Sequence, residues 1–114
     1  MQDRTLEVLR ATEVVIANHF ALEGETGDEW DDERIFRAAL IERIVQLLEY
    51  QLERLMHILY RIDVDEAAVN RCFRNLPPGE VAAALADLII ARQKEKVLTR
   101  RGMKDKGAGR ESVE

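Results

Sequence analysis

Three residues with metal-binding or acid–base side chains, Glu49, Glu53 and His57, recur at four-residue spacing in the segment EYQLERLMHILYRIDVDE. Residues four apart are neighbours on a helix surface, so these side chains could share a metal ion or a proton. A di-iron helical bundle requires Glu-x-x-His on each of two helices and a glutamate from each of two others. Here the spacing is i,i+4, the motif occurs once, and the row lies on the polar side of its helix. We therefore interpret it as a solvated helix face.

A metal site is the alternative interpretation of the same residues. His19 is the only other histidine, and a site from His19, His57, Glu13 and Glu53 would require the first two helices to pack antiparallel. The candidate metal ligands are thus His57, Glu53, Glu49 and His19, as in a metal-dependent enzyme of the helical-bundle type. The sequence contains no nucleophile elbow, phosphate-binding loop or dinucleotide fingerprint. We expect no catalytic residue and no cofactor.

The acidic segment EGETGDEWDDE, residues 23–33, suggests calcium, but it lacks the ligand spacing of an EF-hand loop. Capping explains it better. With Asp31 as the N-cap of the next helix, Trp30 and Ile35 have the spacing of a hydrophobic staple. Cys72 is the only cysteine, so neither an internal disulfide nor a thiolate zinc site is expected. It falls on the apolar side of a short helix, where we expect an inert thiol.

Length and composition favour one soluble helical domain. The 114 residues suit a single domain, and 46% hydrophobic with 34% charged residues excludes wholesale disorder. The charged N-terminus MQDRTLEVLR is not expected to be a signal peptide, and no apolar run approaches the ~18 residues that span a bilayer. A lone cysteine is typical of a reducing compartment, so we expect a cytoplasmic protein.

The apolar pattern predicts three long helices and one short helix in an all-α, antiparallel bundle. A first helix covers residues 3–22. Residues 32–62 contain no Gly and no Pro, and they predict one unbroken helix roughly 46 Å long. Asp63 caps a short helix over 64–75, and the last helix covers 78–102. We predict a helical domain over 1–102 and a disordered basic tail over 103–114.

Charge is distributed unevenly along the chain. Residues 92–110 hold eight basic and two acidic side chains, whereas residues 1–91 hold nine basic and eighteen acidic ones. A basic cluster can bind phosphates without sequence preference, which makes a nucleic-acid accessory protein an alternative function. Basic residues also complement the dipole of a helix C-terminus without any partner. The candidate nucleic-acid-binding residues are Arg92, Lys94, Lys96, Arg100, Arg101, Lys104 and Lys106.

The segments ILYRIDVDE, DLIIARQKEK and TRR together resemble small bacterial proteins of unassigned function. The resemblance covers roughly residues 40–101 and consists of a helix–turn–helix pattern. It implies a bacterial cytoplasmic setting, and it supplies neither an activity nor site residues.

The function we predict from the sequence is a non-enzymatic protein–protein interaction or assembly protein that forms a homodimer. The helix over 32–62 has a broad apolar face that we do not expect the three other helices to cover completely. The alanine-rich last helix would let a neighbouring helix approach closely.

Overall fold

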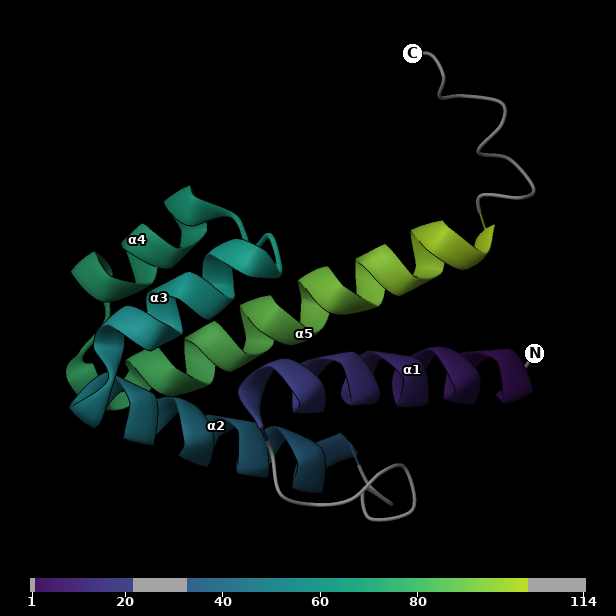
Figure 1. Cartoon of the computed structure of the whole chain (residues 1–114), viewed down its shortest axis with the longest axis horizontal. Coiled ribbons are helices and arrows are strands. Elements are labelled where there is room, and N and C mark those ends of the chain that lie inside the picture. The colour runs from purple at the N-terminus through teal and green to yellow at the C-terminus, as the bar shows by residue number, and fades with distance from the viewer. Residues whose placement is uncertain (1, 22–32, 103–114) are drawn as a thin grey trace.

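The computed structural model describes residues 2–21 and 33–102, and this part of the chain folds into five α-helices without a β-strand. The helices are α1 (Gln2–Phe20), α2 (Glu33–Tyr50), α3 (Leu52–Arg61), α4 (Glu66–Asn75) and α5 (Pro78–Gly102) (Figure 1). The prediction of an all-helical protein is confirmed. Among these five helices, none combines the length and the apolar character that crossing a bilayer requires.

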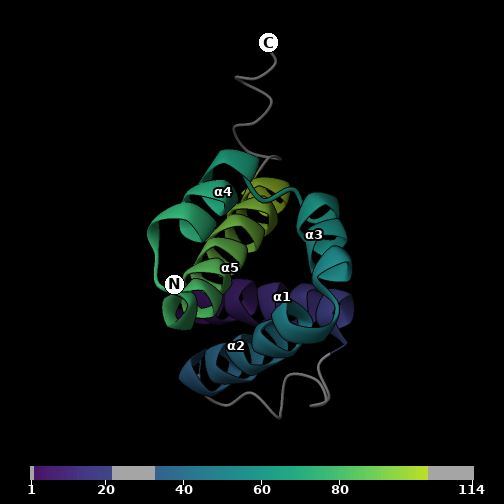
Figure 2. The same ribbon diagram turned by 90° about the vertical axis from the view of Figure 1, so that its left-hand side faces the viewer.

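The long helix α5 is the element around which the others are arranged. In Figure 1, α1 and α2 lie below α5, and α3 and α4 lie above it. The perpendicular view places α3 and α4 on opposite sides of α5 (Figure 2). Each of α1, α2 and α4 packs directly against α5.

Helices α1 and α2 do not pack antiparallel as expected. Both run in the same general direction, from right to left in Figure 1, and α5 runs the opposite way. Short connections force sequential helices to reverse direction. Twelve residues separate Phe20 from Glu33, and a chain of that length can span about 40 Å, so it imposes no reversal.

The prediction of one unbroken helix over 32–62 is wrong, because the helix breaks at Gln51 and α3 turns back over α5 (Figure 1). Gln51 has φ −146° and ψ 57° and no side-chain cap. Helical hydrogen bonds continue on both sides, from Gln51 N–H to the Leu47 carbonyl (2.8 Å) and from Leu55 N–H to the Gln51 carbonyl (3.1 Å). A single unfavourable backbone conformation therefore separates two helices.

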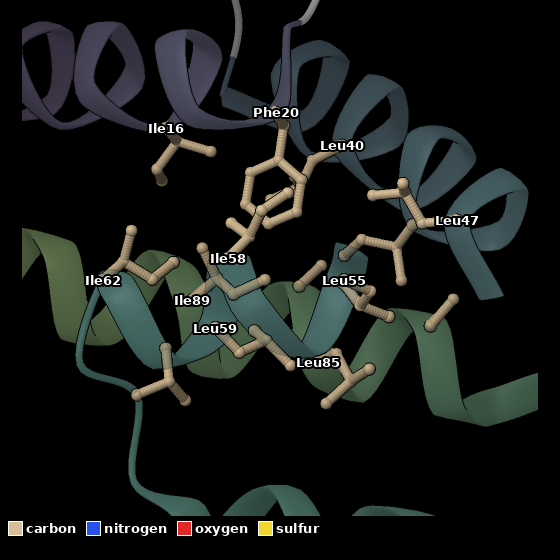
Figure 3. Packing of buried hydrophobic residues seen from close by; sticks show 14 of the residues in the cluster. Ile16, Phe20, Leu40, Leu47, Leu55, Ile58, Leu59, Ile62, Leu85 and Ile89 are labelled. Atoms are coloured by element: carbon tan, nitrogen blue, oxygen red, sulfur yellow. The ribbon is translucent and has the colours of Figure 1, made fainter. Parts of the chain in front are cut away.

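Packing explains why the chain bends where no Gly or Pro demands it. With α3 folded back, Leu55 and Leu59 are buried together with Leu40 and Leu47 of α2 (Figure 3). A straight helix would leave that half of its apolar face in water, at a cost of about 1.5–3 kcal/mol for each large side chain. Burial of this size exceeds the roughly 1–3 kcal/mol that one strained residue costs.

The turn between α3 and α4 also differs from the prediction. Asp63 does not cap α4, since it has φ 66°, the left-handed conformation that Asp tolerates better than most residues. Asp65 is the N-cap instead, and its carboxylate accepts a hydrogen bond from Ala67 N–H at 3.3 Å. The helix consequently begins at Glu66, two residues later than predicted.

The core lies where α1, α2, α3 and α5 converge (Figure 3). Val81, Leu85 and Ile89 of α5 are buried, and Leu88 packs partly buried against the same cluster. Several predictions concern residues outside the described part of the chain. They are the acidic loop with the Trp30 staple and the Asp31 cap, and the tail over 103–114. They stay predictions.

Candidate functional site

The row of Glu49, Glu53 and His57 is divided by the break at Gln51. Glu49 lies at the end of α2, whereas Glu53 and His57 lie on α3, and all three side chains are exposed. His19 is exposed in the last turn of α1. Within residues 2–21 and 33–102, no three His, Cys, Asp or Glu side chains come together in a way that could hold a metal ion. The structure thus does not assemble the candidate ligands.

Glu13 is a titratable residue in an unusual place. Its side chain is only 6% exposed on the core side of α1, and its Oε1 atom has no hydrogen-bond partner among the described residues. Burial raises the pKa of the Glu13 carboxyl to about 7, nearby Arg10 opposes this rise, and Glu33 adds to it. The sequence signal for this site is a charged residue that interrupts the apolar face of α1. Glu13 is the only buried acid among the described residues.

Two of the candidate nucleic-acid-binding residues have structural partners. Arg92 donates to the Asp63 carbonyl (3.0 Å), the Asp63 carboxylate (2.8 Å) and Glu95 (3.0 Å). The hydrogen bond from Arg92, and then its charge, lowers the pKa of the Asp63 carboxyl. Lys94 lies 3.8 Å from a carboxylate oxygen of Glu33. These contacts hold α5 against the α3–α4 turn and the start of α2.

The remaining basic candidates are described only in part. Lys96 is half-buried and Arg100 is exposed, while the side chain of Arg101 and residues Lys104 and Lys106 lie outside the described part. Beside Arg92, the buried Gln93 amide donates to the Ile62 carbonyl at 2.7 Å. The start of the basic segment therefore stabilises a turn, and nucleic-acid binding by the rest stays a prediction.

Cys72 is half-buried on α4 and packs against the core. This position agrees with the predicted apolar side of the short helix.

Exposed apolar side chains are concentrated between the end of α2 and α4. Of the nine large hydrophobic residues that are clearly exposed in the described part, six fall in residues 45–73: Val45, Tyr50, Leu52, Met56, Tyr60 and Phe73. Leu52, Met56 and Tyr60 follow one another at four-residue spacing on α3, with 49%, 37% and 85% of their surface exposed. We call these three residues the α3 stripe.

An open groove lies on the surface formed by the end of α2, the end of α4 and the start of α5. Its volume is about 520 Å³. Nine residues line it: Val45, Leu48, Glu49, Phe73, Leu76, Pro78, Gly79, Val81 and Ala82. Glu49 is the only charged residue among them. A binding site for a small substrate usually adds several convergent polar groups to an apolar wall, and this groove does not.

Comparison of the chain with protein-family models, with curated proteins and with solved structures found no match.

Sequence reasoning assigned the α3 stripe only in part. Leu52 belongs to the apolar side of the helix predicted over 32–62, and it is exposed because the break at Gln51 changes which sides of α3 face the core. Tyr60, at the other end of the stripe, is also exposed. The available signal was the apolar spacing of residues 52, 56 and 60, which cannot distinguish a buried row from an exposed one.

Proposed function

We propose that this protein is a non-enzymatic interaction protein that works through protein–protein association and forms a homodimer. The observation that carries the proposal is the α3 stripe, in which Leu52, Met56 and Tyr60 are all exposed in one row on the same helix. Scattered exposed apolar residues are normal on a monomer, but several exposed in one row on a helix favour an interaction surface. Tyrosine and methionine, both present here, are enriched in protein interfaces.

Two further observations support association rather than catalysis. The only buried acid in the described part, Glu13, has no second titratable residue buried beside it. The groove between α2, α4 and α5 has an apolar lining with one carboxylate, which suits contact with side chains more than chemistry on a polar substrate. The single cysteine supports a reducing cytoplasmic setting for this proposal.

Sedimentation velocity of the full chain over a series of protein concentrations tests the proposal. We expect the sedimentation coefficient to rise with concentration from that of a monomer to that of a dimer. A strict monomer at high micromolar concentration would contradict homodimerisation. Light scattering on the same samples gives the molar mass independently of molecular shape.

A further inference from the structure

Two rows of exposed side chains run side by side along the outer side of α3. The first row is the α3 stripe of Leu52, Met56 and Tyr60, and the second consists of Glu53, His57 and Arg61. The buried face of α3 carries Leu55, Ile58 and Leu59 (Figure 3). At 100° per residue, the centre of the stripe lies roughly 110° around the helix from that buried face. The stripe therefore borders the core without being covered by it.

The second row carries opposite charges at its two ends, so it is complementary to an antiparallel copy of itself. Glu53 lies in the first turn of α3 and Arg61 in the last turn, with His57 midway. A second α3 laid antiparallel on the first would place Glu53 of each copy opposite Arg61 of the other. A parallel arrangement would place like charges together, which is unfavourable. This charge pattern favours another copy of the same chain as the occupant of the surface.

The stripe has the same symmetry. In the antiparallel arrangement Leu52 of one copy faces Tyr60 of the other, and Met56 lies near the two-fold axis. Contacts in which residue i meets residue j and j meets i define an isologous interface, the commonest kind in homodimers. Neighbouring rows at i±4 spacing are also the ridges by which packed helices interdigitate.

We infer that α3 is the dimer contact of this protein and that the two copies pack their α3 helices antiparallel through the α3 stripe, with Glu53 and Arg61 paired reciprocally. The inference rests on the proposed homodimer and specifies the surface that forms it. It also gives a role to the Glu53–His57 row.

Charge reversal with rescue tests the arrangement. In the variant Glu53→Arg, two arginines face each other at both ends of the interface, and in Arg61→Glu two glutamates do. We expect each single variant to raise the dimer dissociation constant about tenfold or more, because like charges across an interface are strongly unfavourable. The double variant Glu53→Arg/Arg61→Glu restores opposite charges and should bring the dissociation constant back to near the wild-type value.

A matched control lies on α4. Glu66 and Arg74 occupy the first and last turns of that helix with the same eight-residue separation, and both are exposed. The swap Glu66→Arg/Arg74→Glu reverses charge against the helix dipole just as the α3 swap does, but it leaves α3 unchanged. This control should dimerise like the wild type. If it dimerises as poorly as the single α3 variants, helix destabilisation accounts for their loss and the inference fails.

Met56→Lys tests the stripe itself, since it places two ammonium groups near the two-fold axis. Sedimentation velocity should show this variant as a monomer, and circular dichroism should show wild-type helicity. If the wild type and Met56→Lys dimerise equally well, the α3 contact is wrong. The proposed homodimer would still hold in that case. Failure of the double charge swap to rescue the single variants would overturn the antiparallel arrangement. A monomeric wild type would contradict both proposals.

Discussion

Two polar side chains enter the interior of the described part of this protein with opposite outcomes, Gln93 on α5 and Glu13 on α1. Gln93 is 3% exposed, and its amide donates to the Ile62 carbonyl in the turn that leads from α3 to α4. Glu13 is also buried, but one carboxyl oxygen has no hydrogen-bond partner among the described residues, and burial raises the pKa of the group to about 7. A buried polar group stabilises a fold only when it is paired, so these residues should respond oppositely to the same substitution.

Replacement of Glu13 by leucine should produce the larger effect. At pH 8 the wild-type carboxylate is ionised in a buried place, and a raised pKa of about 7 corresponds to a cost of up to ~3 kcal/mol relative to water. Glu13→Leu removes that cost, so its free energy of unfolding at pH 8 should exceed the wild-type value by roughly 1–3 kcal/mol. Urea denaturation at pH 8 measures the difference.

The pH dependence gives this prediction its sign. The folded-state pKa of Glu13 lies above its unfolded value, so the folded state binds the proton more tightly than the unfolded state does. The contribution of Glu13 to the wild-type free energy of unfolding should therefore be largest below about pH 4.5 and should fall as the pH rises to about 7. Glu13→Leu should lack this fall, and the exposed control Glu42→Leu should retain it. If the free energy of unfolding depended on pH equally in the wild type and in Glu13→Leu, the Glu13 carboxylate would be solvated.

Replacement of Gln93 by leucine should lower stability. The Ile62 carbonyl would lose its donor in a buried position, which costs about 1–3 kcal/mol. Thermal and urea unfolding of Gln93→Leu measure the loss, with Gln46→Leu on the exposed side of α2 as the control. A neutral result would mean that water replaces the amide, and the contrast with Glu13 would disappear.

The smallest effect is expected at Arg92, which contacts the same turn from the surface. Arg92→Met keeps the apolar stem of the side chain and removes both ion pairs, with Asp63 and Glu95. Exposed ion pairs contribute little because solvent screens them, so the loss should be smaller than that of Gln93→Leu and should shrink further in high salt. A loss as large as that of Gln93→Leu would show that the arginine, rather than the buried amide, holds the turn.

The sequence predicted the helices wherever a local signal marked their ends. Pro78 begins α5 and Gly102 ends it, as expected from a proline at the first position and a glycine at the end. The α3–α4 turn was located correctly, but its cap is Asp65 and not the predicted Asp63, since an aspartate at either position satisfies the same local preference. Only tertiary contacts distinguish them, since Arg92 and Gln93 bind the turn at Asp63 and Ile62.

The break at Gln51 could not be predicted, and the α3 stripe could not be predicted as a consequence. No residue near position 51 disfavours a helix, and the apolar spacing continues through it. The chain bends because the free energy gained by burying Leu55, Ile58 and Leu59 against the rest of the core exceeds the free energy lost by interrupting the helix. The spacing of apolar residues indicates which of them share a side of a helix, but it does not indicate which other element covers that side.

The one-residue connection at Gln51 couples the orientation of α3 to the length of the chain. A single added or deleted residue there would turn α3 by about 100° relative to α2 and would exchange part of its buried face for its outer rows. The twelve-residue separation between Phe20 and Glu33 has no such restriction. During divergence, homologous chains should therefore accept insertions and deletions between α1 and α2 while keeping the spacing from α2 to α3 constant.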